Sequence, residues 1–210
     1  MNPLEKTALL LAGGSLSVTP RVLELVRSRA LVIAADGGAR HAEPLGLTID
    51  LWVGDFDSSD DLAQITAPRQ TFAPEKDKTD LELALGIAKT RGATRALVLG
   101  AFGGRFDHAL GIGLMAARET QVGFTIDLES GTESGWVLTP AQPLELPLRA
   151  GQTFSVLALE EAKGLSIAGA KWPLERVTLA FGASLGISNE ARGAVSLWLQ
   201  TGLALVIAQW

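Results

Sequence analysis

The stretch LVIAADGG, residues 31–38, runs from five apolar residues directly into an aspartate and two glycines. A short apolar run that ends in a turn signal is typical of a strand buried on both faces of a parallel sheet. Four other runs of this kind lie in the same part of the chain, and we expect strands there at Ala8–Ala12, Leu51–Gly54, Ala96–Gly100 and Gly123–Leu128. Together, the five runs predict a mainly parallel sheet.

Helical patterns separate these runs. Thr19 followed by Pro20 is a typical helix start, because Thr caps free N–H groups and Pro favours the first helical position. Val22, Leu25 and Val26 would then face the core. Further helices are expected at Gly38–Leu45, Asp80–Thr90 and Arg105–Arg118. This alternation of strands and helices predicts an α/β domain.

The pattern changes after about Leu128, where Gly, Thr, Ser and Pro separate short alternating runs. Turn signals about every ten residues are typical of an antiparallel sandwich or partial barrel. We therefore predict an α/β domain with a mainly parallel sheet at residues 1–130 and an all-β sandwich domain at residues 131–210. The strands expected in the second domain are Gly135–Thr139, Leu144–Leu148, Thr153–Ala158, Leu165–Ala168, Ala194–Leu199 and Ala204–Ala208.

Composition excludes several classes of protein. The formal net charge is −5 and the Lys and Arg residues are scattered, whereas a nucleic-acid-binding protein usually carries a basic face. The 210-residue chain has no cysteine, which excludes disulfides and thiolate metal sites and fits the cytoplasm. Its first apolar run, Ala8–Ala12, is too short for a signal sequence or a membrane span. We expect a cytoplasmic protein that binds neither nucleic acid nor membrane.

Four segments that carry aspartate are the candidates for chemistry. Ligands of an open parallel sheet bind where its strands end, and three of these segments directly follow a predicted strand. The fourth precedes the helix expected at Asp80–Thr90. In chain order, the segments are Asp36–Gly38, Asp55–Ser59, Lys76–Asp80 and Ala101–His108.

Asp55 and Asp57 form the sharpest of these signals. Two carboxylates at this spacing in a loop can turn toward one cation, and unit charges about 4 Å apart repel by roughly 4 kcal/mol at an effective dielectric near 20. A compensating cation is therefore needed, and Mg²⁺ suits an all-oxygen site. The alternative is structural: both residues form turns or cap a helix, just as Asp77 would cap a helix that carries Asp80 in its first turn.

The glycine-rich segment before the last predicted helix of this half points to phosphate. Gly103 and Gly104 would let phosphate oxygens approach backbone N–H groups at a helix start, and Arg105 could bind a phosphate with two hydrogen bonds. Glycine-rich turns between strands and helices are also common without any ligand. His108 is interpreted as a hydrogen-bonding residue at the helix start. The coincidence of acidic and glycine-rich loops at one end of the sheet favours metal–polyphosphate chemistry.

The combined segments resemble the thiamine pyrophosphokinase family. Their order and spacing fit this family over nearly the whole chain, although no single motif is specific. The matching segments are Ala35–Ala39, Gly54–Ser58, Lys76–Leu85, Gly103–His108, Gly169–Leu174 and Gly186–Glu190.

The resemblance implies a two-domain homodimer. The N-terminal domain would hold ATP and Mg²⁺, and the C-terminal domain would help to form the thiamine site at the dimer interface. The implied reaction transfers the pyrophosphoryl group of ATP to the hydroxyl of thiamine, which gives AMP and thiamine diphosphate.

The resemblance also implies residue roles. Asp55, Asp57 and Asp80 match the acidic positions that hold Mg²⁺ and orient the hydroxyl, and Arg105 adds positive charge for the phosphates. The remaining matches are expected to line the nucleotide, phosphate and thiamine sites: Asp36, Gly37, Asp77, Thr79, Gly103, Gly104, Asp107, Ser188 and Asn189. Of these, Ser188 and Asn189 would reach thiamine in the partner subunit.

Some positions depart from the family pattern. Ile112 stands where members often carry Asn, and an isoleucine side chain cannot make the polar contact of an asparagine. Trp198 and Trp210 are both candidates for a ring beside thiamine, whereas Trp172 is expected in the core.

Two other functions remain open. One is a haloacid-dehalogenase-like phosphatase; that family carries an Asp-x-Asp pair after its first strand, whereas the pair here follows the third predicted strand. The other is a sensor that binds nucleotide or thiamine without turnover.

Overall fold

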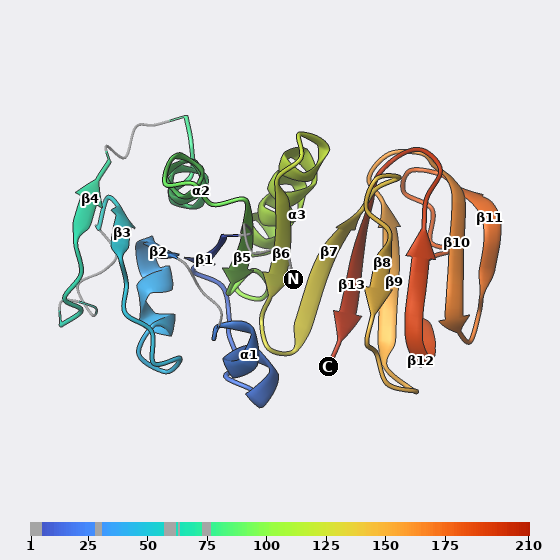
Figure 1. The fold of residues 1–210 in the computed structure, drawn as a ribbon, viewed down its shortest axis with the longest axis horizontal. Helices are drawn as coiled ribbons and strands as arrows, with labels where there is room; N and C mark the ends of the chain where they lie inside the picture. The colour runs from blue at the N-terminus through green and yellow to red at the C-terminus, as the bar shows by residue number, and fades with distance from the viewer. Residues whose placement is uncertain (1–5, 28–30, 57–61, 63, 73–76) are drawn as a thin grey trace. The chain divides into compact units, whose positions relative to one another are not determined.

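A computed structural model describes residues 6–27, 31–56, 62, 64–72 and 77–210 (Figure 1). The chain divides into two compact units. The first contains the described residues up to Met115 together with Phe124–Thr132, and the second contains Ala116–Gly123 and Glu133–Trp210. The assignment of separate tasks to residues 1–130 and 131–210 stays a prediction.

The first unit is built on a parallel sheet. Its strand order is β6-β5-β1-β2-β3-β4, and every neighbouring pair runs parallel. All five predicted strands are present within one or two residues of their expected bounds, and β4 is an additional strand that lacks an apolar run. The bounds are β1 Thr7–Leu11, β2 Leu31–Ala35, β3 Leu51–Gly54, β4 Arg69–Thr71, β5 Arg95–Leu99 and β6 Thr125–Glu129.

Helices connect these strands. They are α1 (Pro20–Leu25), the 3₁₀ helix η1 (Asp36–His41), α2 (Asp80–Thr90) and α3 (Phe106–Gln121). Thr19 caps α1 as predicted, accepting a hydrogen bond from the Val22 N–H at 3.2 Å. The expected burial of Leu25 is wrong: this residue is the last of a six-residue helix, and its side chain is 42% exposed. The helix expected at Gly38–Leu45 begins earlier, directly after β2, and takes the tighter 3₁₀ form.

The second unit is antiparallel, as predicted. Its strands follow the order β7-β13-β9-β12-β10-β11, and β8 pairs with β12. The start of β12 pairs with β9 through Asn189 and Glu190, whereas its later part pairs with β8 and β10. The bounds are β7 Glu133–Leu138, β8 Leu144–Leu146, β9 Thr153–Ala158, β10 Ala162–Ala170, β11 Leu174–Leu179, β12 Asn189–Trp198 and β13 Ala204–Gln209.

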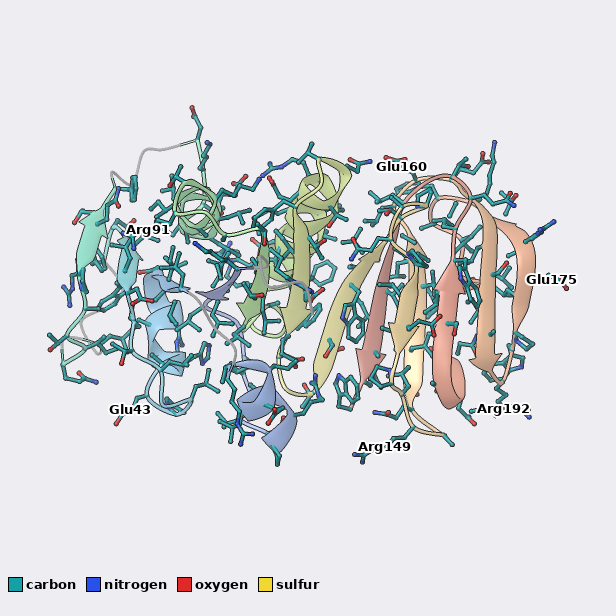
Figure 2. The ribbon with its side chains drawn as sticks, viewed as in Figure 1. Glu43, Arg91, Arg149, Glu160, Glu175 and Arg192 are labelled. Atoms are coloured by element: carbon teal, nitrogen blue, oxygen red, sulfur yellow. The ribbon has the colours of Figure 1, made fainter. Side chains whose placement is uncertain are left out.

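The strands of the second unit enclose one apolar core. Phe154, Leu165, Ile167, Val195 and Leu197 are buried together in it. Charged side chains of this unit lie outside the core, as Figure 2 shows for the exposed Arg149, Glu175 and Arg192. Because β12 takes part in two groups of strands around one core, the unit has the sandwich form that the sequence predicts.

The fold class is therefore confirmed: parallel strands with helices come first, and antiparallel strands follow. Across the described residues, none of the helices has the length and apolar character needed to cross a membrane.

Candidate active site

The predicted site segments of the first unit lie at the carboxyl edge of its sheet, where the strands end. The neighbouring strands β5, β1, β2 and β3 all point the same way, so the segments that follow them share this edge. Those segments begin at Gly100, Ala12, Asp36 and Asp55. The sequence therefore correctly predicts that the acidic and glycine-rich segments meet at one end of the sheet.

The segments after β1 and β5 are joined by backbone hydrogen bonds. The Gly14 N–H donates to the Gly100 carbonyl at 3.1 Å, and the Ser15 N–H donates to the Phe102 carbonyl at 2.9 Å. A Cβ atom added at Gly14 would lie 2.4 Å from the Gly100 oxygen. Gly103, with φ 75°, lies against Ser15, since an added Cβ would be 2.8 Å from the Ser15 Oγ. Only glycine fits these contacts, and backbone groups are thereby brought to the edge.

The last residue of β6, Glu129, supports the same edge. The Glu129 carbonyl accepts hydrogen bonds from the Gly100 and Ala101 N–H groups. Its carboxylate is 1% exposed and pairs with both terminal nitrogens of Arg21, at 2.6 and 2.8 Å. A buried carboxylate needs such a partner, and losing Arg21 would leave a costly uncompensated charge. Glu129 therefore helps to fix the loop in which Gly100 lies.

Asp36 and Asp55 are brought close together by neighbouring strands. Gly54 lies beside Asp36, because a Cβ atom added at Gly54 would be 3.3 Å from the Asp36 Cα. The buried Trp52 donates its Nε1–H to the Asp36 carbonyl at 2.9 Å. Asp36 has φ 42° and Phe56 has φ 65°, in the left-handed region that non-glycine residues avoid. Such strained residues cluster at functional sites. Asp36 is itself one of the candidate aspartates, and Phe56 directly follows the other, Asp55.

The start of α2 brings a further aspartate to this side of the sheet. The chain leaves the end of β4, passes through α2 and enters the beginning of β5, so α2 begins at the carboxyl edge. Asp80 is the first helical residue, as expected, and is half-buried. The N-cap is Thr79 rather than Asp77: its Oγ1 accepts from the Glu82 N–H, while Glu82 accepts from the Thr79 N–H. This reciprocal pair is favoured by a Glu three residues after Thr.

The predicted magnesium ligands are only partly within the described structure. Asp55 and Asp80 are described and half-buried, whereas Asp57 lies outside the described residues. No group of three or more His, Cys, Asp or Glu side chains is close enough to hold a metal among the described residues. The chemistry of the three carboxylates suits Mg²⁺, but their assembly into one site stays a prediction.

Arg105 and Asp107 form an exposed ion pair at the start of α3. The Arg105 Nη2 lies 2.6 Å from the Asp107 Oδ2, and its Nε lies 3.1 Å from Oδ1. The hydrogen bond from Arg105 lowers the pKa of the Asp107 carboxyl, and the same bond raises the pKa of Arg105. The two hydrogen bonds orient the exposed guanidinium of Arg105, which directly follows Gly103 and Gly104 in the segment where the sequence predicts phosphate binding.

His41 is a residue of this edge that the sequence interpretation missed. It ends η1, is half-buried, and its Nε2 lies 2.9 Å from the Gly14 carbonyl oxygen. Its partner groups belong to the backbone, so no side-chain motif marks it in the sequence. The sequence gives only two hints: the chain has two histidines, and His41 is the one that lies close to Asp36 in the sequence.

In the second unit, Ser188 and Asn189 lie at the start of β12. Ser188 has φ 60°, and its N–H donates to the Ser155 Oγ. Asn189 is 6% exposed, and its amide makes hydrogen bonds with both the N–H and the carbonyl of Trp172. Trp172 is 55% exposed, so its expected place in the core is wrong. It lies in the tight turn between β10 and β11, and the Lys171 Nζ packs 4.8 Å from its ring centre.

Three other positions singled out in the sequence, Ile112, Trp198 and Trp210, are exposed or half-buried. Ile112 is half-buried on α3, and Trp198 and Trp210 are 42% and 37% exposed. The Trp210 Nε1–H donates to the Ser134 Oγ at 2.7 Å. Both rings remain candidates for stacking on a ligand.

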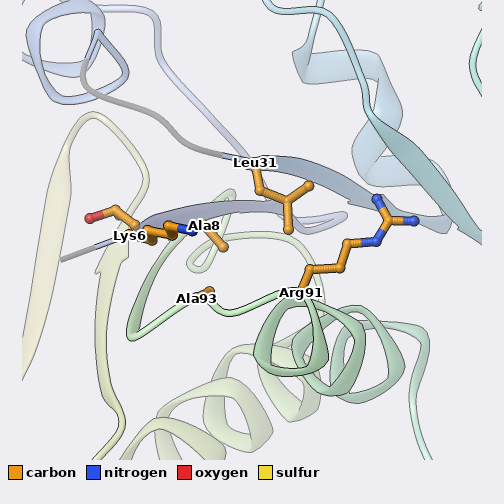
Figure 3. A pocket seen from close by; sticks show the side chains of 6 residues that line it. Lys6, Ala8, Leu31, Arg91 and Ala93 are labelled. Atoms are coloured by element: carbon orange, nitrogen blue, oxygen red, sulfur yellow. The ribbon is translucent and has the colours of Figure 1, made fainter. Parts of the chain in front are cut away.

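A hollow lies at the opposite, amino edge of the sheet (Figure 3). Its volume is about 320 Å³, and its lining includes Lys6, Leu31 and Arg91. These residues lie where β1 and β2 begin and where α2 ends. None of the predicted site residues lines this hollow, so shape alone does not mark the candidate site.

Two family models match the chain. "Thiamin pyrophosphokinase, catalytic domain" matches residues 22–125, and "Thiamin pyrophosphokinase, vitamin B1 binding domain" matches residues 142–203. Together they cover most of both units, and the first spans the segments after β2, β3 and β5 at the carboxyl edge.

Individual proteins agree with these matches. The thiamine pyrophosphokinase of Bacillus subtilis (strain 168) is 26% identical over 200 residues, which cover 91% of this chain and 94% of the relative. The crystal structure of thiamine pyrophosphokinase from Bacillus subtilis superposes with TM-score 0.80 at 25% identity, covering 97% of this chain and 99% of that one. A thiamin pyrophosphokinase family protein from Enterococcus faecalis gives TM-score 0.75 at 25% identity, with coverages of 98% and 99%.

Proposed function

The chain belongs to the thiamine pyrophosphokinase family, and on this premise we propose that it transfers a pyrophosphoryl group from ATP to thiamine. The oxygen of the thiamine hydroxyl forms a bond to the β-phosphorus of ATP, and the bond from that phosphorus to the bridging α-phosphate oxygen breaks. The hydroxyl proton is released, and the products are thiamine diphosphate and AMP. The observation that carries the proposal is the meeting of acidic and glycine-rich segments at one edge of the sheet in the first unit.

Mg²⁺ would be held by Asp55, Asp57 and Asp80. Their carboxylates are the hard oxygen ligands that this ion prefers, and Asp55 and Asp80 both lie at the carboxyl edge. When bound, the ion supplies positive charge that neutralises phosphate oxygens. One of these three carboxylates would also orient the thiamine hydroxyl and receive its proton. Asp36, which lies beside Gly54, would line the same space from the adjacent strand.

The glycine loops and Arg105 would bind the phosphates of ATP. Transfer of this kind depends mainly on positioning and charge neutralisation. Gly37, Gly103 and Gly104 would let phosphate oxygens approach the backbone, and Arg105 would add a positive charge. Asp107 would hold Arg105 in the orientation seen here through its two hydrogen bonds. Asp77 and Thr79 are exposed and directly precede α2 in the chain. They would contact the substrate from the start of this helix.

Thiamine would be bound with the help of the second unit. The support is the family match at residues 142–203, which includes Ser188 and Asn189. Because the Asn189 amide holds the backbone of Trp172, its direct contribution would be to shape this segment. Trp198 and Trp210 are the candidates for stacking on the thiamine rings.

We also propose that the protein is a homodimer with the thiamine site at the interface. The support in the first unit is an apolar stripe on α3: Phe106, Leu110 and Leu114 follow each other at four-residue spacing and are 79%, 50% and 51% exposed. Exposed apolar patches of this kind mark interaction surfaces. Leu110→Glu should shift the dimer to monomer in sedimentation experiments, whereas Leu23→Glu on α1, 39% exposed, should not. A monomeric wild-type protein would contradict this part of the proposal.

We further propose a cytoplasmic location for the protein, which the cysteine-free sequence favours.

The direct test is product analysis. Purified protein is incubated with ATP, Mg²⁺ and thiamine, and the products are separated by chromatography. AMP and thiamine diphosphate in equal amounts support the proposal. ADP with thiamine monophosphate would indicate single phosphoryl transfer, free phosphate would indicate a phosphatase, and binding without turnover would indicate a sensor; each of these results overturns it.

A further inference from the structure

We propose that His41 is a positioning residue for ATP, holding the Gly14–Ser15 segment against the Gly103–Gly104 loop so that both present their backbone to the phosphates. The inference rests on the proposed function, because it assigns a further residue to the phosphate site. It adds a side chain that lies outside the segments carrying the family resemblance.

His41 contacts two of the loops that end at the carboxyl edge. It belongs to η1, which follows β2, and its Nε2 lies 2.9 Å from the Gly14 carbonyl in the segment after β1. The same nitrogen lies 3.0 Å from the place that a Cβ atom at Gly100, directly after β5, would occupy. One side chain therefore lies where the ends of three neighbouring strands meet.

The hydrogen bond has a defined direction. The Gly14 carbonyl can only accept, so the Nε2 of His41 carries a proton and donates it. Burial lowers the pKa of His41, and the nearby charge of Arg40 acts in the same direction, while hydrogen bonds to the carbonyls of Gly14 and Ala12 oppose it. The neutral ring is thus favoured near pH 7, in the tautomer with hydrogen on Nε2.

Contacts lead from this bond to the predicted phosphate loop. Gly14 is followed by Ser15, whose N–H donates to the Phe102 carbonyl at 2.9 Å. The Ser15 side chain lies against Gly103, where an added Cβ atom would be 2.8 Å away. A shift of the Gly14 carbonyl would therefore displace Ser15 and, with it, the backbone at Gly103. A misplacement of about 1 Å in a group that positions substrate can cost about a hundredfold in rate.

The test compares His41→Leu with His41→Gln. Leucine fills similar space without a donor, whereas the glutamine amide can donate to the same carbonyl. We expect His41→Leu to raise the KM for ATP about tenfold while kcat and the KM for thiamine change less than about threefold, and His41→Gln to stay within about threefold of wild type throughout. Thr120→Val is the control, since it removes a buried hydrogen bond of 2.8 Å to the Ala116 carbonyl on α3, away from the loops.

A purely structural role predicts a different pattern. His41→Leu would then lower the melting temperature, as Thr120→Val does, and leave the KM for ATP unchanged; that result overturns the inference. ¹⁵N spectra of the His41 ring give a readout independent of activity, and a neutral ring with hydrogen on Nδ1 would also overturn it. If the wild-type protein makes no thiamine diphosphate, the proposed function fails, whereas an active wild type with an unaffected His41→Leu variant contradicts this inference alone.

Discussion

The two edges of the parallel sheet in the first unit are built in different ways. At the carboxyl edge, the segments after β1, β5 and β6 are joined by hydrogen bonds, and the close contacts at Gly14 and Gly103 leave no room for a Cβ atom. At the amino edge, a hollow of about 320 Å³ is lined by Lys6, Arg91 and their neighbours. The carboxyl edge is close-packed and holds its polar groups in fixed positions, whereas the amino edge is open.

The hollow and the fixed polar groups therefore lie at different edges of the sheet, so a search for cavities and a search for reactive groups would point to different sites. A hollow requires only that side chains leave space. The left-handed backbone at Asp36 and Phe56 has a conformational cost, and the buried ion pair of Arg21 and Glu129 has a desolvation cost. These costs are concentrated at the carboxyl edge, where open parallel sheets bind their ligands.

The largest effect is expected from removing a carboxylate at the carboxyl edge. Asp55→Asn and Asp80→Asn should each lower kcat by about a hundredfold or more, because a neutral amide neither balances Mg²⁺ nor takes up a proton. Steady-state assays of product formation measure this change, with circular dichroism to check folding.

Asp50→Asn is the matched control. It lies directly before β3, at the other end of the strand that leads to Asp55, and its Oδ2 accepts a hydrogen bond from the Val32 N–H at 2.8 Å. An asparagine oxygen can accept the same bond, so kcat should stay within about twofold of wild type. Equal losses in Asp50→Asn and Asp55→Asn would remove the contrast between the two edges.

An intermediate effect is expected from Gly14→Ala. The new Cβ would lie 2.4 Å from the Gly100 oxygen and 2.6 Å from the Phe102 oxygen, so the two loops must separate. We expect kcat/KM for ATP to fall at least about tenfold and the free energy of unfolding to fall by roughly 1–3 kcal/mol. Gly86→Ala on the exposed face of α2 meets nothing within 4 Å, and should raise stability by about 0.5–1 kcal/mol without changing kcat/KM. Unchanged kinetics in Gly14→Ala would contradict the close pairing of the loops.

A smaller effect is expected on the pH dependence of stability. Burial lowers the pKa of His41 in the folded state below its ordinary value of 6.5. Above this value both states are neutral, and as the pH falls through it the unfolded chain takes up a proton that the folded one does not, so stability is lost. Between pH 7.5 and 5.5 the melting temperature should therefore decrease more for wild type than for His41→Gln. Parallel decreases in scanning calorimetry would show that His41 does not make this contribution.

The smallest effect is expected at the amino edge. Arg91→Ala removes a cation from the hollow, but its exposed side chain lies where α2 ends, away from the carboxyl edge (Figure 2). The KM for ATP and kcat should both stay within about twofold of wild type. A tenfold increase in the KM for ATP would place nucleotide at this hollow instead.

Much of the fold follows from periodicity in the sequence. The five buried strands of the first unit are continuous apolar runs, and α2 was predicted from Asp80 to Thr90, as observed. Strands that are little buried carry no such signal: β4 consists of Arg69, Gln70 and Thr71, all exposed, and β11 has a single buried residue, Leu179. Their pairing depends on neighbouring strands, which a local pattern does not contain.

The position of a site segment can be predicted from the sequence where it depends only on the direction of the strand that precedes it. Parallel strands bring Asp36, Asp55 and the glycine segment to one edge wherever their side chains point. His41 could not be found in this way, because its partner is a carbonyl oxygen of Gly14, distant in the sequence. Trp172 was misplaced for a similar reason: its apolar ring suggests burial, but the turn between β10 and β11, held by Asn189, leaves it exposed.

The central claim is that the metal–nucleotide complex binds at the carboxyl edge of the first unit. ATP with Mn²⁺ in place of Mg²⁺ broadens the NMR signals of nearby amides, and ¹⁵N-labelled protein reports every part of the sheet at once. Broadening concentrated at Gly14, Asp36 and Asp55, with sharp signals at Lys6 and Arg91, is the predicted result. Broadening at Lys6 and Arg91, with sharp signals at the three carboxyl-edge residues, would contradict it.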